Sequence, residues 1–391
     1  MAAAGAPWAA FSAVWFAYFA GVGLFNPYAP LWFKELGFST LAIGAIASMQ
    51  SWTRIVAPYG WGWLGDHGGR RVWLIRWACA AAVVAAAALL FARGYTAVAV
   101  CTVMLFLANG AVVPLAESSL ASHLATAQGM NTARYGRVRL WGSLGFMVAV
   151  VAAGGVLQWG GIGLFPWLVL GLFCVLLLAA LRLPASREDV SGRAQAPAVL
   201  SVLRRPEVGW FFAALFFTVL AHTSLYAFFS LYIDELGYPK AAVGALWAVS
   251  VAAEVMFFWF QGRVFSGVAA HRWLQWAAAL TVLRLAATAA FGASATVLVL
   301  AQLLHAVTFA AQHLACIVLI NRYFPGPLRG RGQALYSVLG YGISGVIGGF
   351  GGGWLSARFG FAAVFWAGAA AAAMGWVCAV LAARDRPQDA R

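Results

Sequence analysis

The chain is poor in charged residues and in cysteine, and it lacks motifs for binding nucleotides or metals. Only 9% of its 391 residues are Asp, Glu, Lys or Arg, whereas soluble globular domains carry about 25%. This deficit excludes a water-soluble globular protein. The five cysteines, at positions 79, 101, 174, 316 and 378, all lie inside apolar stretches. A disulfide framework is therefore not expected.

No P-loop is present in the sequence, so we do not expect ATP to drive any process that this chain carries out. No Cys/His cluster has the spacing of metal ligands, and no nucleophile lies in a recognisable catalytic motif. The sequence therefore predicts neither an enzyme nor a cofactor.

Long apolar runs take up most of the chain, of which 63% is hydrophobic. Each run is long enough to cross a hydrocarbon core of about 30 Å. A membrane β-barrel would instead show strands of about ten residues with alternating polarity. The sequence predicts an all-α polytopic membrane protein. Twelve spans are expected at about 9–33, 40–64, 73–92, 97–122, 137–158, 161–183, 209–233, 241–261, 273–292, 294–320, 332–356 and 359–382.

The distribution of basic residues indicates the orientation of these spans. If the N-terminus is inside, the inner segments together with the cytoplasmic ends of the spans hold 18 of the 25 Lys and Arg residues, the outer loops hold four, and three lie further inside spans. This asymmetry predicts cytoplasmic termini in a bacterial inner membrane, and it explains the net charge of +14 without nucleic acid. The N-terminus has no basic n-region or cleavage site, so its first apolar stretch is predicted to be span one rather than a signal peptide.

The chain divides at its midpoint into two similar parts. The polar segment 184–208, with prolines and mixed charges, is predicted to be a cytoplasmic linker between six-helix halves at 1–183 and 209–391. The string Leu-x3-Glu-Leu-Gly, which begins at residue 31, recurs 200 residues later, and both copies are followed by a glycine seven residues on. Parallel halves are typical of transporters with a mid-membrane substrate site between them, although channels are also built from repeats.

The loop after span two carries a pattern of glycine, acidic and basic residues: Gly62, Asp66, Gly69, Arg70 and Arg71. This pattern resembles the signature loop of the major facilitator superfamily. The basic residue that usually follows the Asp is His67 here. We expect Asp66 to cap the next helix and the arginines to bind anionic headgroups. An ordinary glycine-rich basic turn is the alternative.

In the first half, Glu117 lies inside an apolar span, at a cost of roughly 2.5–3.5 kcal/mol. Arg139 in span five is its natural counter-ion if that side chain turns inward; snorkelling to lipid phosphates is the alternative. An Arg–Glu pair in a cavity can bind a polar or anionic ligand. Arg54 in span two can neutralise an anionic substrate or pair with a glutamate, and Asn26 lies on a mixed aromatic and polar face of span one.

The second half carries Glu254 in span eight and Arg284 in span nine. Span ten has a polar stripe at helical spacing, which cannot face lipid without cost and should line a cavity. The stripe consists of Gln302, His305, Thr308, Phe309, Gln312 and His313. Span seven adds His222 and Tyr226, spaced by four residues. A purely structural role is the alternative for each histidine.

The segments Tyr135–Ser143, Ala253–Val255 and Leu304–Leu314 resemble the 3-phenylpropionate permease family and, more distantly, lactose permease and the oligosaccharide–proton symporters. The resemblance implies the major facilitator fold. It also implies that Glu117 and Arg139 bind substrate, and that Glu254 and His305 join substrate to proton. Thr308 stands where lactose permease has its proton-carrying carboxylate, so the proton is expected on Glu254 with His305.

These observations predict a secondary transporter, in which membrane-embedded groups that exchange protons couple transport to the proton gradient. We expect a monomeric proton symporter that imports a small organic solute such as an aromatic carboxylate. A sugar or nucleoside symporter, an exporter, a channel and a non-transporting receptor remain alternatives. The expected substrate ligands are Asn26, Arg54, Glu117, Arg139, His222, Tyr226, His305, Phe309 and His313; the expected coupling residues are Glu254, His305 and Arg284.

Overall fold

Helices make up nearly all of the computed structural model, which describes residues 7–68, 70–126, 129–130, 132–184, 199–265 and 267–384. The exception is a two-residue antiparallel ladder between β1 (Ala125–Thr126) and β2 (Gly129–Met130). The contacts of the chain define two units. Unit 1 comprises 1–38, 53–192 and 239–245, and unit 2 comprises 39–52, 193–238 and 246–391.

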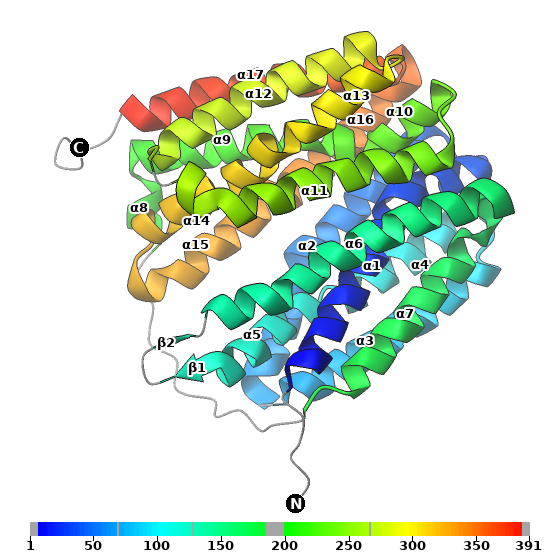
Figure 1. Ribbon diagram of the computed structural model, residues 1–391, viewed down its shortest axis with the longest axis horizontal. Coiled ribbons are helices and arrows are strands. Elements are labelled where there is room, and N and C mark those ends of the chain that lie inside the picture. The colour runs from blue at the N-terminus through cyan, green and yellow to red at the C-terminus, as the bar shows by residue number, and fades with distance from the viewer. Residues whose placement is uncertain are drawn as a thin grey trace, which may run out of the picture. The chain divides into compact units, whose positions relative to one another are not determined.

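Unit 1 is built around α1, which packs along α6 and α7, while α3 packs against α4 and α7 (Figure 1). Its elements are α1 (Trp8–Glu35), most of α2 (Thr40–Gly68), α3 (Arg71–Phe91), α4 (Gly94–Asn109), α5 (Val112–Leu124), α6 (Thr132–Gly160), the 3-10 turn η1 (Ile162–Leu164) and α7 (Phe165–Leu181).

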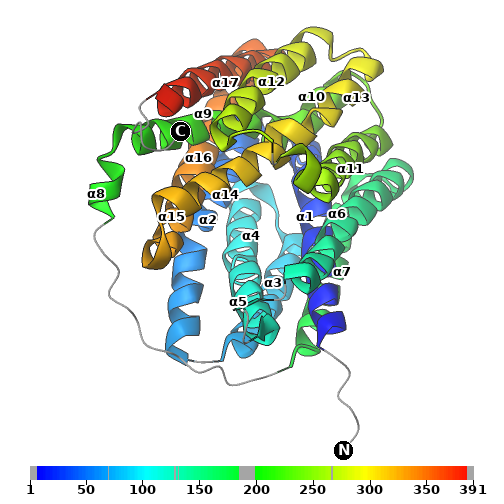
Figure 2. The same ribbon diagram turned by 60° about the vertical axis from the view of Figure 1, so that its left-hand side comes forward.

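In unit 2, α17 packs between α9 and α12, and the three helices run side by side in both views (Figures 1 and 2). The elements are the first part of α2, α8 (Leu200–Leu203), α9 (Pro206–Thr223), η2 (Ser224–Phe228), α10 (Phe229–Glu235), most of α11 (Lys240–Val264), α12 (Ala270–Phe291), α13 (Ala295–Leu303), η3 (Ala306–Ala311), α14 (Gln312–Tyr323), η4 (Gly326–Leu328), α15 (Arg329–Leu335), η5 (Tyr336–Ile343), α16 (Ser344–Phe359) and α17 (Phe361–Arg384).

Eleven helical stretches in the described residues are long and apolar enough to cross a membrane. They correspond to eleven of the twelve predicted spans. The second predicted span, 40–64, forms a helix of 29 residues but is not among the eleven. Its sequence contains Gln50, Ser51 and Arg54 together with several glycines, and these lower its hydropathy although its length suffices.

The repeated string forms the same helix end twice. Gly37 and Gly237 follow α1 and α10 with φ angles of 80° and 84°, a conformation that favours glycine. The amide of Gly37 donates to the Lys34 carbonyl, and that of Phe38 donates to Phe33; the same pattern recurs 200 residues later. Both ends are Schellman motifs, so the sequence repeat encodes the same chain reversal in each half.

The glycines that follow these motifs allow helices to approach closely. A Cβ on Gly44 of α2 would meet the carbonyl oxygen of Gly349 and lie 2.9 Å from the Cα of Gly353, both on α16. A Cβ on Gly244 of α11 would lie 2.5 Å from the Val150 carbonyl oxygen on α6. The first turns of α2 and α11 are therefore fixed by backbone contacts, which small residues permit in membranes.

Arg76 lies within α3, yet its charge is accommodated by the end of another helix. Its guanidinium donates to the carbonyl oxygens of Ala180, Leu181 and Leu183, at 3.4, 3.1 and 2.8 Å. These carbonyls close α7, where the last turn lacks intrahelical donors and the helix dipole favours a cation. The cation also lies over the Trp73 ring at 5.2 Å. Arg76 thus has a structural role in unit 1.

Three helices of unit 2 are interrupted by π-helical segments: η2, η3 and η5. Such segments are rare, hold more residues per turn than an α-helix and are frequent at functional sites. The predicted spans at 209–233, 294–320 and 332–356 therefore each contain a local change of register. The predicted halves 1–183 and 209–391 remain a prediction; the contact-defined units differ from them at 39–52 and 239–245.

Candidate functional site

In unit 1, α5 and α6 bring the predicted pair Glu117 and Arg139 together. The Arg139 Nε atom lies 4.0 Å from Glu117 Oε1, and the two side chains are 38% and 39% exposed. Tyr135, one helical turn before Arg139, donates its hydroxyl to the same carboxylate oxygen at 3.2 Å. The arginine side chain therefore lies beside the glutamate. The Glu117 carboxylate keeps its second oxygen open among the described residues.

Aromatic rings of α1 hold the Arg139 guanidinium. Its central carbon lies 4.4 Å from the centroid of the Trp15 ring and 5.5 Å from that of Phe19, and these two rings are stacked. Cation–π contact of this kind restrains the guanidinium and leaves its N–H groups able to donate. Within the described part of the chain, the terminal nitrogens of Arg139 make no hydrogen bond, and the buried Trp15 Nε1 has no acceptor. The terminal nitrogens of Arg139 and the indole nitrogen of Trp15 could therefore donate to an acceptor group.

The other predicted residues of the first half lie around this pair at different distances. Arg54, Arg139 and Glu117 all act electrostatically on Tyr18, so Arg54 belongs to the same neighbourhood. Asn26 lies eight residues after Tyr18 on α1, or about 12 Å along the helix axis, and is partly buried. Arg54 is exposed.

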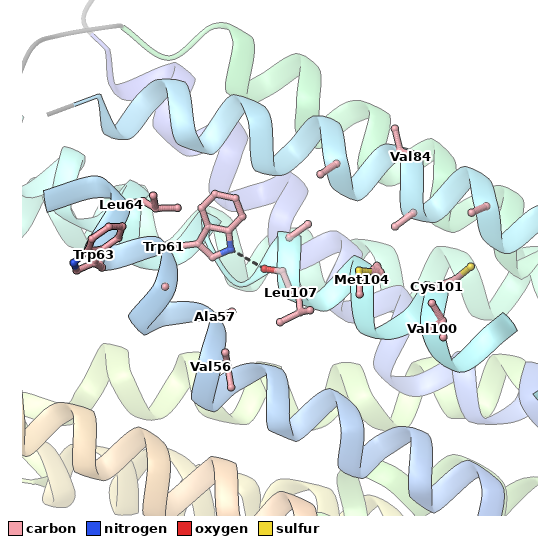
Figure 3. A pocket seen from close by; sticks show the side chains of 15 residues that line it. Val56, Ala57, Trp61, Trp63, Leu64, Val84, Val100, Cys101, Met104 and Leu107 are labelled. Atoms are coloured by element: carbon pink, nitrogen blue, oxygen red, sulfur yellow. Dashed lines mark hydrogen bonds between the residues drawn. The ribbon is translucent and has the colours of Figure 1, made fainter. Parts of the chain in front are cut away.

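The position of Glu117 depends on the break between α4 and α5. Pro114 in the first turn of α5 lacks an amide hydrogen, so the preceding helix cannot continue unbroken. The indole of Trp61 on α2 donates to the Leu107 carbonyl at 2.8 Å, which satisfies an acceptor at this break (Figure 3). Glu117 therefore lies on a short helix that starts after the break.

Beside the break, α2, α3 and α4 line an apolar cavity of about 940 Å³ (Figure 3). Its walls are mainly Val, Ala, Leu, Met and Trp side chains, and it contains none of the predicted substrate ligands. The side-chain donor of Trp61 is already engaged by Leu107. This cavity lacks the polar groups that usually orient a ligand.

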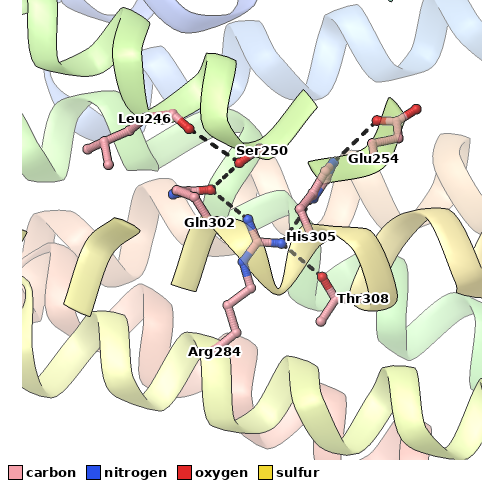
Figure 4. A network of polar contacts seen from close by, with 7 residues as sticks. All are labelled: Leu246, Ser250, Glu254, Arg284, Gln302, His305 and Thr308. Atoms are coloured by element: carbon pink, nitrogen blue, oxygen red, sulfur yellow. Dashed lines mark hydrogen bonds and ion pairs between the residues drawn. The ribbon is translucent and has the colours of Figure 1, made fainter. Parts of the chain in front are cut away.

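In unit 2, Arg284 is the centre of a buried polar network (Figure 4). Its side chain is 2% exposed. Nη1 donates to His305 Nδ1 at 3.0 Å and to Thr308 Oγ1 at 2.9 Å, and Nη2 donates to Gln302 Oε1 at 2.7 Å. Ser250 on α11 donates to the same glutamine oxygen. All acceptors of this guanidinium are neutral groups, and its buried Nε has no partner among the described residues.

Glu254 contacts the network through His305 rather than through Arg284. Its Oε2 lies 3.7 Å from His305 Nε2, and Figure 4 shows the imidazole between the carboxylate and the guanidinium. The Glu254 side chain is 20% exposed, whereas that of His305 is 7% exposed. The structure thus brings together the three predicted coupling residues, in the order Glu254, His305, Arg284.

Along the α13–η3–α14 helix, which carries His305, aromatic rings form a stack. The ring of Phe309 is parallel to that of His305 at 4.8 Å and nearly parallel to that of His313 at 6.2 Å. His313 Nδ1 lies 2.7 Å from the hydroxyl of Tyr336, which lies 3.1 Å from that of Tyr341. The two histidines therefore have different surroundings at opposite ends of the stack.

His222 and Tyr226, the residues predicted in span seven, lie near the Arg284 network. The buried His222 uses Nδ1 to contact the Thr218 carbonyl at 2.7 Å, and its Nε2 has no partner in the described residues. Arg284 and His305 act on its ring electrostatically. Tyr226 stacks on Trp247 with ring centroids 6.2 Å apart.

Sequence reasoning missed Ser250, Tyr336 and Tyr341 as members of these clusters. Ser250 precedes Glu254 by four residues, so helical spacing could have identified it. The two tyrosines are five residues apart, a spacing that brings side chains together in a π-helix rather than in an α-helix. No group of three or more His, Cys, Asp or Glu side chains in the described ranges could hold a metal ion.

The predicted signature loop differs in detail from its expected form. The α2 helix extends to Gly68 and includes Gly62 and the backbone of Asp66, while Gly69 lies outside the described residues. The N-cap of α3 is Arg70, and it makes no side-chain cap bond. Arg70 rather than Asp66 therefore takes the N-cap position of α3, because α2 continues past Asp66. The Asp66 side chain lies outside the described residues, so its role as a cap stays a prediction. Arg71 is the first residue of α3.

Comparison with known proteins adds the family context. The family model described as "MFS_1 like family" matches residues 8–367. The chain is 29% identical over 348 residues to the "Probable 3-phenylpropionic acid transporter" of Escherichia coli (strain K12), covering 84% of this chain and 86% of that protein. It is also 29% identical over 344 residues to the maltose permease of Geobacillus stearothermophilus, covering 85% and 83%.

Solved structures show the same architecture. A mutant of the nucleoside transporter NupG superposes with a TM-score of 0.82 at 16% identity, covering 98% of this chain and all of that one. A bacterial homolog of the human lysosomal transporter Spinster, in an inward-facing and unoccupied conformation, superposes with a TM-score of 0.70 at 15% identity, covering 98% of each. At these identities the likeness shows the fold, and it confirms the predicted fold class.

Proposed function

The chain belongs to the MFS_1 like family and is a membrane transporter rather than an enzyme, and from this premise we propose that it imports a small organic anion together with protons. The proposal places the protein in a bacterial inner membrane with both termini in the cytoplasm. The basic residues of the segments predicted to be internal support this orientation. Membrane lipid would contact the exposed apolar side chains, such as Trp159 and Phe91.

The observation that carries the substrate class is the geometry of Arg139. Its guanidinium lies over the Trp15 ring, its charge is partly balanced by Glu117, and its terminal nitrogens are open in the described structure. A guanidinium edge with two open donors matches a carboxylate in bidentate geometry. The surrounding aromatic rings suit an aromatic acid, in keeping with the name of the relative from Escherichia coli.

A sugar or nucleoside is the second candidate. One oxygen of Glu117 is open in the described structure and would accept a hydroxyl group, as Tyr135 already donates to the other oxygen. The equal identity to a maltose permease supports this reading. In that case Arg139 would position Glu117 and donate to a neutral hydroxyl group.

Proton coupling is proposed to use Glu254. Burial favours the neutral form of a carboxyl group, and a nearby cation favours its charged form. Glu254 is partly exposed and is linked through His305 to the buried charge of Arg284. A conformational change that separates Glu254 from this network would therefore favour proton uptake by the carboxylate.

Uptake into energised vesicles tests the proposal, with a panel of aromatic acids, sugars and nucleosides, with and without a protonophore. We expect accumulation of an aromatic acid that collapses with the proton gradient. Uptake that is insensitive to the protonophore would refute symport, and accumulation of a sugar or nucleoside alone would favour the second candidate. Glu254→Gln should abolish accumulation and leave counterflow exchange intact, whereas unchanged accumulation would make Glu254 a structural residue.

A further inference from the structure

The two histidines on the α13–η3–α14 helix differ in what their Nδ1 atoms face. His305 Nδ1 faces the Arg284 guanidinium at 3.0 Å. His313 Nδ1 faces the hydroxyl of Tyr336 at 2.7 Å. A guanidinium has only donors, whereas a hydroxyl both donates and accepts. This difference determines where each ring can carry protons.

His305 has one proton arrangement in this geometry. Because Arg284 donates to Nδ1, that nitrogen must accept with its lone pair, and the ring proton resides on Nε2. The Nε2 atom then points its proton at Glu254 Oε2, 3.7 Å away. A second proton on His305 would break the hydrogen bond from Arg284 and place two cations close together in a buried site. His305 is thus suited to position its neighbours in its neutral form.

His313 has two proton arrangements. Tyr336 can donate to Nδ1, or Nδ1–H can donate to Tyr336 while the Tyr336 hydroxyl donates to Tyr341, 3.1 Å away. Addition of a proton at Nδ1 therefore requires only that the Tyr336 hydroxyl turn. The His313–Tyr336 and Tyr336–Tyr341 contacts are both kept. The ring is also partly exposed, whereas His305 is buried.

We infer that His313, with Tyr336 and Tyr341, forms a proton-exchange site, and that His305 stays neutral throughout. The inference deepens the proposed function, on which its role in transport rests. One proton from solvent binds the neutral His313 ring, Nδ1–H then donates to the Tyr336 oxygen, and the Tyr336 hydroxyl proton turns to Tyr341. The reverse sequence returns the proton, and the number of protons balances at every step.

The groups around this site are compatible with a proton there. Tyr226 on η2 and Cys316 on α14 act electrostatically on Tyr336, and neither is a cation. Phe309 lies between the rings of His313 and His305, so the Arg284 charge is not in contact with His313. Packed against α14, the helix α12 carries His271, which bonds to Tyr323, and α15 carries two exposed arginines. These are Arg329 and Arg331.

Nitrogen-15 NMR of histidine-labelled protein in nanodiscs tests the inference without any transport assay. Spectra would be recorded from pH 5 to pH 8, with His305→Gln and His313→Gln used to assign the two rings and His123→Gln as a control outside both clusters. We expect the His313 ring to titrate and the His305 ring to stay in the Nε2–H form. Titration of His305, or a His313 ring with no change across the range, would overturn the inference.

Transport assays separate this inference from the proposed function. His313→Gln should lose the pH dependence of uptake, and Tyr336→Phe should shift the His313 titration because the hydroxyl is lost. Unchanged pH dependence in His313→Gln, with wild-type uptake sensitive to a protonophore, would refute the role of the site and leave symport standing. If a protonophore does not change wild-type uptake, the proposal of symport is refuted. The NMR titration still tests whether His313 exchanges protons.

Discussion

Arg284 donates from Nη1 to the Nδ1 atom of His305 across 3.0 Å. This contact links a guanidinium that is almost completely buried to a carboxylate that is not, because the opposite nitrogen of the same ring faces Glu254. The His305 ring therefore separates the charge of Arg284 from the carboxylate of Glu254. A buried charge without a direct counter-ion is costly, so the neutral acceptors around it are essential to its stability.

Replacement of Arg284 by lysine should destabilise the protein and abolish accumulation. An ammonium cannot reach His305, Thr308 and Gln302 from the positions of the guanidinium nitrogens. Each buried acceptor left without a donor costs about 1–3 kcal/mol. Thermal unfolding in detergent measures the loss, with the exposed Arg272→Lys on the same helix as control. Equal melting temperatures for the two variants would contradict the prediction.

Replacement of Arg139 by alanine should weaken substrate binding by about tenfold or more. A hydrogen bond to a charged group contributes roughly 1.5–3 kcal/mol, and 1.4 kcal/mol corresponds to a factor of ten. Equilibrium binding of the transported solute measures the effect. Arg137→Ala is the control, because that side chain is exposed two residues earlier on α6. Unchanged affinity in Arg139→Ala would make the arginine a structural residue.

Removal of the Tyr135 hydroxyl should have a smaller effect. Tyr135→Phe keeps the ring and removes one donor to Glu117, and a hydrogen bond of this kind contributes about 1 kcal/mol. We expect a several-fold loss of affinity that disappears when Glu117 is already replaced by alanine, which has no acceptor. Additive effects of the two substitutions would show that the contact does not matter for binding.

Alanine at Gly44 should destabilise the protein by about 1–3 kcal/mol, the usual cost of overpacking. Its Cβ would meet backbone atoms of Gly349 and Gly353, which cannot turn aside as a side chain can. Gly60→Ala on the same helix is the matched control, since nothing lies within 4 Å of a Cβ there. That variant should be neutral or slightly stabilising, because alanine favours helices. Melting temperatures of the two variants should therefore shift in different directions or to different extents.

Much of the architecture was predictable because it rests on local chemistry. Apolar runs identify eleven of the spans directly, and Leu36-Gly37 and Leu236-Gly237 mark two helix ends whose hydrogen bonds need only neighbouring residues. The α2 helix is the exception, because it is long enough to cross a membrane but its mean hydropathy is too low for it to be identified as a span. Helix length is set by backbone geometry, whereas hydropathy averages over side chains that a folded neighbour can shield.

The candidate site was predictable in part. The pairing of Glu117 with Arg139 follows from the cost of an isolated charge in lipid, which requires a partner. The link from Glu254 to Arg284 through His305 depends on distances between three helices, which spacing along one helix does not specify. The Tyr336–Tyr341 contact depends on a π-helical register that the sequence pattern does not indicate. Which solute is transported stays a prediction.

The π-helical segment η3 gives one transmembrane helix an unusual tolerance to changes in length. A π-helical turn holds an extra residue, so a single deletion within 306–311 can restore α-helical geometry and leave both flanks on their original faces. In contrast, α12 has no such extra residue. A single deletion between the start of α12 and Arg284 would rotate the rest of the helix by about 100° and turn Arg284 away from its acceptors. A single deletion that spares Thr308 and Phe309 should therefore be tolerated better in the first segment than in the second.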